Sequence, residues 1–306
     1  MAAATVLAIH PGALGDVLLT IPALRALRAR HPDARLVLAA QSHLGRLLVD
    51  LAEVDLASAF ESLGLESLFV EDGGPADVPA ISEAVQVICW FGSRDATFTS
   101  RLRALAPDAV IASAVANGPG AVWQHLMATV GHDGEAARGP VAPSSALVAD
   151  GREALREAGW DGRRPVLLIH VGAGGLVKRW PVEGFAQVIA AIVRRRDVAV
   201  AIHEGPADVD AVATLAGRVN HAFVLKQPPL PRLAGALCHV AACLGNDSGV
   251  THLAAAVGTP TVALFGAENV AWQPWAKTAR LVVIEPSRLR ADDVSAVTLT
   301  LDSLFD

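Results

Sequence analysis

The sequence predicts an α/β protein made of two doubly wound domains, each with a mostly parallel sheet. Short apolar runs alternate with helical patterns, and this alternation starts again after the middle of the chain. The length of 306 residues suits two hydrophobic cores better than one. Hydrophobic residues make up 52% and charged residues 18%, which is typical of helices packed on buried parallel strands.

The first half contains four apolar runs that we expect to be strands, at 5–10, 34–40, 85–91 and 108–113. After the first run a helical pattern continues to about Arg30, and Val17, Ile21 and Leu24 share one face of it. Pro22 lies one or two turns into this helix. Because proline lacks an N–H donor, it should loosen or kink the helix there.

The alternation of apolar runs and helical patterns is interrupted at residues 131–165, and we place the domain boundary between residues 148 and 149. Beyond a short helix at 149–158, the expected strands are 165–170, 198–204, 222–225, 239–247 and 261–266, with helices at about 182–196 and 249–257. The tail, 291–306, is expected to form a closing helix capped by Asp292 or Asp293.

The two halves begin with similar segments. "VLAIHPGA" starts at Val6 and "VLLIHVGA" at Val166, and each predicts a first strand that ends in a His-x-Gly-Ala loop. Duplication and chance similarity in alanine-rich sequence are both open explanations. Ligands of parallel sheets gather at the carboxyl ends of the strands, so two such domains facing one another would form a cleft.

Charge and cysteine content exclude several classes of protein. The formal net charge is −6 and no basic stripe is present, which argues against a nucleic-acid partner. Three cysteines without a C-x-x-C pair favour a reducing, cytoplasmic compartment. No apolar run reaches the roughly 18 to 20 residues of a membrane span, while peripheral attachment to the inner face of a membrane stays open. Cys238, His239 and Cys243 fit core packing better than a metal site.

The loop "HPGALGD" leads from the first strand into a helix. Its glycines let backbone N–H groups approach a ligand at the positive end of that helix. The spacing is G-x-x-G, and the second strand ends at Gln41 instead of an acidic residue, so a nicotinamide-dependent dehydrogenase is disfavoured. Taken by itself, Asp16 fits the N-cap of the helix. A chemical role for its carboxylate is the alternative.

Two segments of the second half suit an anionic ligand. In "HVGAGGLVKRWPVEGF", Lys178 and Arg179 follow a glycine-rich loop and match the oxygens of a diphosphate. The same residues also fit a surface loop, in which Trp180 packs against the protein and Pro181 begins a helix. In "CLGNDSGVTHLAAAVGTPTVALFG", a turn at 246–249 leads into a helix whose N-terminus could bind phosphate.

Other polar residues near these segments allow two readings each. His252 could face the same site one turn later, or it could be a structural histidine. Glu204 ends the second strand of its domain, where ribose hydroxyls are usually held, or it is a solvated loop carboxylate. Arg194, Arg195 and Arg196 fit the C-terminus of a helix. A helical face that is either solvated or turned to an anionic acceptor would carry Arg94, Arg101 and Arg103.

With these motifs assembled, the chain resembles the heptosyltransferases of glycosyltransferase family 9, which transfer heptose from ADP-heptose during lipopolysaccharide core synthesis. The resemblance covers nearly the full length. It is carried by "GALGDVLLTIPAL" at 12–24, "KRWP" at 178–181, "GPAD" at 205–208, "GNDSGVTHLAAAVGTPTVALFG" at 245–266 and "QPW" at 273–275.

The resemblance implies a GT-B fold, in which two Rossmann-like domains face each other across a deep cleft. Residues 1–148 would bind the acceptor, 149–290 the nucleotide sugar, and 291–306 would form a helix that crosses back. Transfer in this family inverts the anomeric centre without a metal or other cofactor. Asp16 would be the base and Lys178 would meet the donor phosphates, and the expected donor site also includes Gly15, His170, Gly172, Ala173, Arg179, Trp180, Glu204, Asp247, Ser248, Gly249 and His252.

One segment departs from the family's pattern. Where many relatives carry an aspartate and a glycine in a stretch like "VIDLQG", residues 87–98 read "VICWFGSRDATF". This region belongs to the acceptor side, so the sequence leaves the acceptor open, whether lipopolysaccharide core or a related glycolipid. A transferase or epimerase that uses another nucleotide sugar, and a non-catalytic nucleotide-binding relative, are the alternatives.

Overall fold

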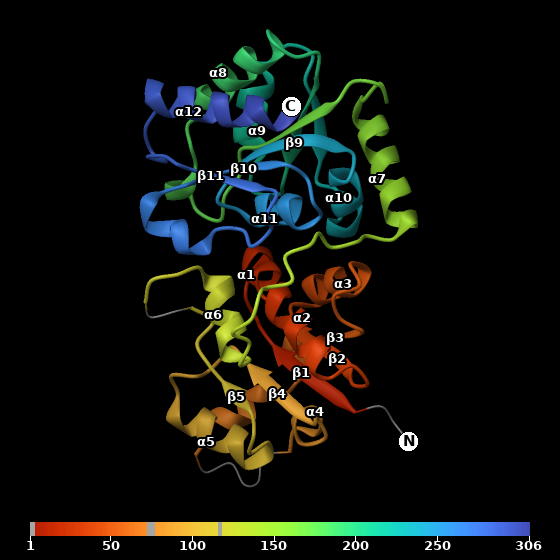
Figure 1. Cartoon of the computed structure of the whole chain (residues 1–306), viewed down its shortest axis with the longest axis vertical. Helices are drawn as coiled ribbons and strands as arrows, with labels where there is room; N and C mark the ends of the chain where they lie inside the picture. The colour runs from red at the N-terminus through yellow and green to blue at the C-terminus, as the bar shows by residue number, and fades with distance from the viewer. Residues whose placement is uncertain (1–3, 72–76, 116–117) are drawn as a thin grey trace. The chain divides into compact units, whose positions relative to one another are not determined.

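The structure, a computed structural model, describes residues 4–71, 77–115 and 118–306. It contains two parallel sheets flanked by helices, so the α/β class is confirmed. Contacts divide the chain into two compact units, Met1–Arg138 and Gly139–Asp306 (Figure 1).

Unit 1 has a five-stranded parallel sheet in the order β3-β2-β1-β4-β5. The strands are β1 (Thr5–Ile9), β2 (Arg35–Ala40), β3 (Leu56–Ala59), β4 (Gln86–Cys89) and β5 (Val110–Ile111). The helices are α1 (Leu14–Leu19), α2 (Ile21–Arg30), α3 (Ser42–Asp50), α4 (Pro79–Ser82), α5 (Ala96–Leu105) and α6 (Val122–Thr129). Strand β1 is central, and the strand order reverses between β1 and β4. The loop after β1 therefore lies at the position where doubly wound sheets bind ligands.

The first helical segment is divided in two at Thr20. Pro22 lies in the first turn of α2, where a missing N–H costs little, and α1 ends before it. The expected loosening at Pro22 is therefore a helix boundary. The sequence did not indicate β3, a four-residue edge strand with no clear alternation of apolar and polar residues.

Unit 2 has a six-stranded parallel sheet in the order β11-β10-β9-β6-β7-β8. The strands are β6 (Val166–His170), β7 (Ala199–Glu204), β8 (Phe223–Lys226), β9 (Val240–Asn246), β10 (Thr261–Phe265) and β11 (Ala279–Val283). The helices are α7 (Ser145–Ala158), α8 (Val182–Val193), α9 (Val209–Ala216), α10 (Leu230–Leu237), α11 (Gly249–Ala256) and α12 (Ala291–Asp302). Because the order reverses between β6 and β9, the carboxyl ends of these two strands flank the switch point.

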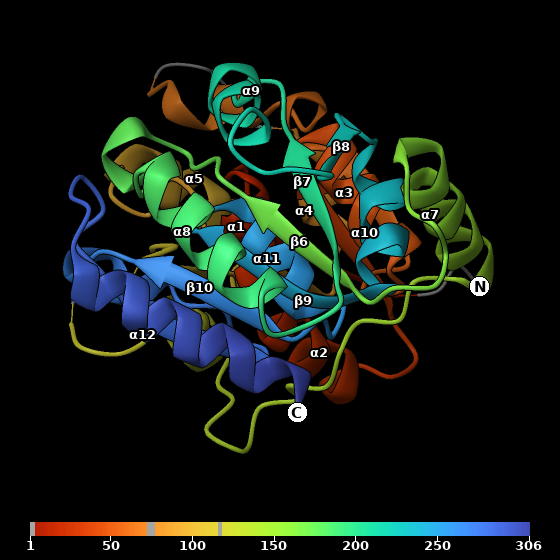
Figure 2. The same cartoon turned by 90° about the horizontal axis from the view of Figure 1, so that it is seen from above.

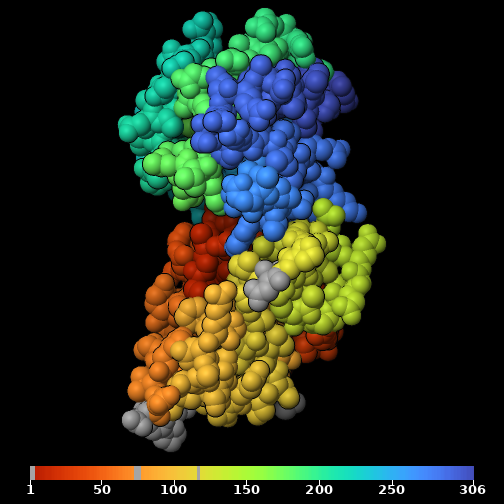
Figure 3. Space-filling model, turned by 90° about the vertical axis from the view of Figure 1, so that its left-hand side faces the viewer, coloured from red at the N-terminus to blue at the C-terminus, as the bar shows by residue number. Residues whose placement is uncertain are grey.

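Helices pack against both faces of the second sheet. Figure 2 shows α7 beside α10 and α8 beside α12, in agreement with their contacts. The first pair approaches closely because Gly151 and Gly235 face the opposite backbone; a Cβ on Gly235 would overlap the carbonyl oxygen of Leu147. Figure 3 shows the deep-blue side chains of α12 next to the green ones of α8 on the surface of this unit.

Helix α12 differs from the sequence expectation at its start. The capping residue is Arg290, and Asp292 and Asp293 lie inside the first turn. The prediction of an aspartate cap was wrong because the helix begins at Ala291. Carboxylates in a first turn still interact favourably with the helix dipole. The predicted return of residues 291–306 to the N-terminal domain stays a prediction.

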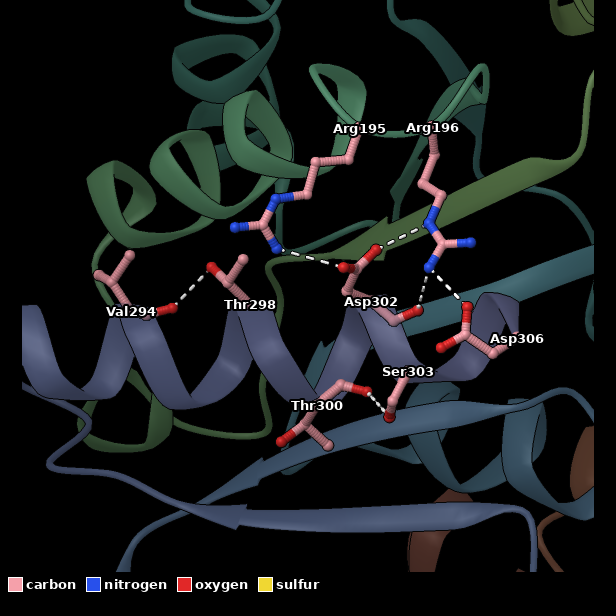
Figure 4. A network of polar contacts seen from close by, with 8 residues as sticks. All are labelled: Arg195, Arg196, Val294, Thr298, Thr300, Asp302, Ser303 and Asp306. Atoms are coloured by element: carbon pink, nitrogen blue, oxygen red, sulfur yellow. Dashed lines mark hydrogen bonds and ion pairs between the residues drawn. The ribbon is translucent and has the colours of Figure 1, made fainter.

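The arginines after α8 bind the end of α12 (Figure 4). Arg195 Nη1 lies 3.2 Å from Asp302 Oδ2, and Arg196 Nε lies 2.8 Å from Asp302 Oδ1. Arg196 Nη2 also lies 2.7 Å from Asp306 Oδ1. Arg195 and Arg196 therefore connect the end of α8 to α12 by ion pairs. The sequence predicted a role for these arginines at the C-terminus of α8, but not these ion pairs.

None of the helices in the described part of the chain is long and apolar enough to cross a membrane. The described residues also hold no group of three or more His, Cys, Asp or Glu side chains placed to bind a metal. His239 Nε2 contacts the Val148 carbonyl at 2.8 Å and Cys243 is buried, whereas Cys238 is exposed, so the expectation of core packing was wrong for Cys238. Burial raises the pKa of the Cys243 thiol to about 12.

Candidate functional site

Asp16 lies in the first turn of α1, in unit 1. The helix starts at Leu14 with Ala13 in the capping position, so Asp16 is not the N-cap that the sequence suggested. Its Oδ2 accepts the backbone N–H of Ala13 at 3.0 Å. An acidic side chain at the third helical position reaches back to an N–H that the helix leaves unpaired, which explains the shift by three residues. Gly15 lies in the same turn, half-buried.

Two residues that sequence reasoning missed fix the loop before Asp16. His10 follows β1, is 3% exposed, and accepts the Gly12 N–H through Nδ1 at 3.2 Å. Gln41 follows β2 and donates from Nε2 to the carbonyl oxygens of Pro11 and Gly12, at 3.2 and 3.1 Å. The signal that could have found both is their position at the carboxyl ends of neighbouring strands.

Lys178 and Asp247 meet at the switch point of unit 2. Lys178 ends a short 3₁₀ helix (Leu176–Lys178), and Asp247 follows β9. Lys178 Nζ lies 2.7 Å from Asp247 Oδ2, with the lysine side chain 32% exposed and the aspartate 8%. The structure therefore brings together two residues that the sequence had assigned to one site.

The turn after β9 is held by local and long-range hydrogen bonds. Ser248 caps α11, and its Oγ accepts the Thr251 N–H at 3.2 Å. Asn246 accepts the Trp180 backbone N–H through Oδ1 at 3.1 Å and donates from Nδ2 to the Val171 carbonyl at 2.8 Å. Asn246 thus links the loops after β6 and β9, a function that its sequence context did not reveal.

His252 lies one turn into α11 and is 4% exposed. Burial lowers the pKa of its imidazole to about 4, and the positive charge of Lys178 adds to this effect. At neutral pH the His252 imidazole is therefore neutral, and it lies in the helix α11 that begins at Gly249.

Arg179 is held by the loop after β7. Its Nη2 lies 3.2 Å from Asp208 Oδ1 and donates to the Ala207 carbonyl at 3.2 Å. The Asp208 carboxylate presses against two glycines: a Cβ on Gly172 would overlap it, and a Cβ on Gly205 would lie 2.7 Å from Oδ2. Asp208 ends the "GPAD" motif at 205–208, but its ion pair with Arg179, 29 positions away, was not predicted.

His170 and His203 form a buried pair at the ends of β6 and β7. Their Nδ1 atoms lie 3.1 Å apart, so one ring donates and the other accepts. Burial is the main cause that lowers the pKa of His170 to about 4 and that of His203 to about 3. His203 was not predicted as part of the site, and both rings are neutral at neutral pH.

The remaining candidate residues of unit 2 are Trp180, Ala173 and Glu204. Trp180 is 1% exposed and packs edge-on against Phe185, as the packing interpretation of this loop expected. Ala173 is half-buried in the loop after β6. Glu204 ends β7 half-buried, and its carbonyl accepts the Gln227 N–H at 2.8 Å. A donor role for these residues stays a prediction.

The sequence profile of glycosyltransferase family 9 (heptosyltransferase) matches residues 86–294, more than half of the chain. The chain belongs to this family. Lipopolysaccharide heptosyltransferase 1 of Pseudomonas aeruginosa is 34% identical over 119 residues, covering 39% of this chain and 33% of the relative. Lipopolysaccharide heptosyltransferase 3 of Escherichia coli K12 is 32% identical over 115 residues, with 36% and 33% covered. The matched segments thus span about a third of these curated relatives.

Solved structures of this family share the fold over nearly the full chain. A family 9 glycosyltransferase from Veillonella parvula has a TM-score of 0.77 at 18% identity, covering 99% of this chain and 97% of that one. E. coli ADP-heptose lipopolysaccharide heptosyltransferase II gives 0.72 at 19%, with 98% of both chains covered. E. coli heptosyltransferase WaaC with ADP gives 0.68 at 17%, with 98% and 99% covered. The GT-B fold class predicted from the sequence is thereby confirmed.

Proposed function

We propose that this protein transfers a sugar with inversion from a nucleotide diphosphate donor, ADP-heptose, to a lipopolysaccharide core or related glycolipid acceptor. The observation that carries the proposal is the Lys178–Asp247 ion pair at the switch point of unit 2, next to the N-terminus of α11. Family membership supports the reaction type. In this proposal residues 149–290 bind the donor, residues 1–148 bind the acceptor, and contact with a membrane is peripheral.

The donor site would stabilise a diphosphate that gains negative charge. Backbone N–H groups at Gly249 and Val250 lie at the positive end of α11, where anions bind. The Lys178 ammonium adds a full positive charge, which the donor diphosphate would draw from Asp247. The Asp247 carboxylate would accept hydrogen bonds from sugar hydroxyls. This chain's own cations and amides would thus offset the leaving-group charge.

Asp16 would act as the general base. Its Oδ2 is engaged by Ala13, and within the described ranges Oδ1 has no hydrogen-bond partner. Asp16 lies in the first turn of α1, at the positive end of the helix dipole. As the acceptor oxygen forms its bond to the anomeric carbon and the bond to the diphosphate breaks, Asp16 takes the acceptor proton and the nucleoside diphosphate leaves. Such help is worth about 10² to 10⁴ in rate, or roughly 3 to 5 kcal/mol.

Isothermal titration calorimetry with ADP, UDP and GDP tests the donor assignment. We expect ADP to bind most tightly, and Lys178→Ala to weaken ADP binding by about tenfold or more because a charge-assisted contact is lost. Lys226→Ala is the matched control, since this exposed lysine ends β8 in the same unit. Equal affinity for the three nucleotides would contradict the ADP assignment. Equal effects of the two lysine variants would contradict the site.

The alternatives predict different products from the same protein. Incubation with ADP-heptose and a core acceptor should yield a glycosylated acceptor and ADP. An epimerase would return altered free sugar without any acceptor, and a non-catalytic relative would bind ADP without turnover. Mass spectrometry of the acceptor separates these outcomes.

A further inference from the structure

We propose that His10 is a positioning residue for Asp16, acting through the hydrogen bond between its Nδ1 and the backbone N–H of Gly12. This proposal rests on the proposed function, in which Asp16 is the base. It concerns residues of unit 1 alone, and it assigns to His10 the orientation of the carboxylate.

The side chains of His10 and Asp16 accept hydrogen bonds from two successive backbone N–H groups, those of Gly12 and Ala13. His10 Nδ1 accepts the Gly12 N–H at 3.2 Å, and Asp16 Oδ2 accepts the next amide, that of Ala13, at 3.0 Å. A Cβ on Gly12 would lie 2.6 Å from His10 Cε1, 2.7 Å from Asp16 Cβ and 2.9 Å from Asp16 Oδ2. The imidazole and the carboxylate therefore flank the same peptide, and the close approach requires glycine between them.

The loop has little freedom to adjust if this hydrogen bond is lost. Gln41 donates to the carbonyl oxygens of Pro11 and Gly12, so side chains hold both of the peptide groups that flank Gly12. The His10 ring lies 6.1 Å from the Trp90 ring, and Trp90 Nε1 donates to Thr129 Oγ1 at 2.9 Å. Because His10 is 3% exposed, its ring cannot turn into solvent without opening this packing.

The hydrogen bond fixes the protonation state in which His10 acts. An Nδ1 that accepts an N–H must carry its lone pair, so the proton of the neutral ring is on Nε2. Burial lowers the pKa of His10, and this effect outweighs the opposing effect of the Asp16 charge. His10 is therefore an acceptor at neutral pH. A protonated ring would point an N–H at the N–H of Gly12.

Two amide substitutions separate the two ring nitrogens. Asn places its side-chain oxygen where Nδ1 is, whereas Gln places it near Nε2. We expect His10→Asn to retain most of kcat and His10→Gln to lower kcat by about tenfold, with ADP-heptose as donor. The affinity for ADP, measured by calorimetry, should be unchanged in both variants because the groups proposed to bind the diphosphate, Lys178 and the N-terminus of α11, belong to unit 2. Equal loss of kcat in the Asn and Gln variants would overturn the proposal.

A double-mutant cycle tests whether His10 acts through Asp16. In an Asp16→Asn background, His10→Gln should cause no further loss, because its effect depends on the carboxylate. A full tenfold additional loss would mean that His10 acts on something else. If Asp16→Asn alone leaves transfer unchanged, the proposed function of Asp16 fails. The His10 variants test the positioning role separately, so the two failures are distinguishable.

A measurement without turnover covers the case in which the variants fold poorly. Long-range ¹H–¹⁵N correlation spectra of the wild-type protein at pH 7 report the protonation of each histidine nitrogen. We expect the neutral His10 ring with its proton on Nε2. A proton on Nδ1, in either the other tautomer or the imidazolium, would overturn the proposal.

Discussion

Acidification should destabilise unit 2 through the buried His252. In the folded protein burial lowers the pKa of this imidazole to about 4, whereas a histidine in an unfolded chain has a value near 6.5. Below about pH 6.5 the unfolded chain therefore binds a proton that the folded chain does not. The stability that neutral His252 provides is fully present above that pH and is lost as the pH falls toward 4.

The size of the effect follows from the two pKa values. At pH 5 the unfolded chain gains about 2 kcal/mol from protonation of this one histidine, whereas at pH 7 the gain is close to zero. Replacing His252 with glutamine removes the titrating group. We therefore expect the free energy of unfolding to fall by about 2 kcal/mol less in His252→Gln than in the wild type between pH 7 and pH 5.

Urea unfolding at the two pH values, followed by circular dichroism and tryptophan fluorescence, measures this difference. His221→Asn is the control, because His221 is exposed in the same unit and asparagine tolerates its positive φ of 62°. The control should lose as much stability as the wild type. If His252→Gln also loses as much, the burial of a neutral imidazole at this position is refuted.

Three further outcomes are expected. Asp208→Asn and Arg179→Gln should each weaken ADP binding several-fold in calorimetry, and the double variant should be no weaker than the worse single one because both remove the same ion pair; additive losses would contradict this. Gly235→Ala should lower the free energy of unfolding by about 2 kcal/mol or more, because the added Cβ overlaps the backbone of α7. Gly174→Ala, which has open space around it, should change the free energy of unfolding by less than about 0.5 kcal/mol. Similar values for the two variants in urea titrations would contradict the close helix contact. Treatment with EDTA should leave the transfer rate unchanged, and a loss restored by a divalent cation would contradict charge stabilisation by the chain's own groups.

Local patterns predicted the elements that local chemistry determines. The residue types of the turn at 246–249 and of the glycine-rich loop before Lys178 predicted that each leads into a helix. In the structure Lys178 Nζ lies 2.7 Å from Asp247 Oδ2. The two-domain α/β class followed from the alternation of apolar runs. Strands β3 and β11, each at the edge of its sheet, were not predicted from the sequence.

Long-range partners explain most of what the sequence did not reveal. Asn246, Asp208 and His203 each act on a residue at least 29 positions away, so their local context carries no sign of it. The position of Asp16 was predicted as a cap because aspartate favours that place, but the helix starts at Leu14. Ala13 then takes the cap position, and the side chain of Asp16 reaches back to it.

The proposed role of Asp16 is to take the proton of the acceptor hydroxyl during transfer. Transfer from ADP-heptose and calorimetric binding of ADP, both measured on Asp16→Asn, test it most directly. We expect transfer to fall by about 10² to 10⁴ while the affinity for ADP stays the same. Unchanged transfer in this variant would contradict this role.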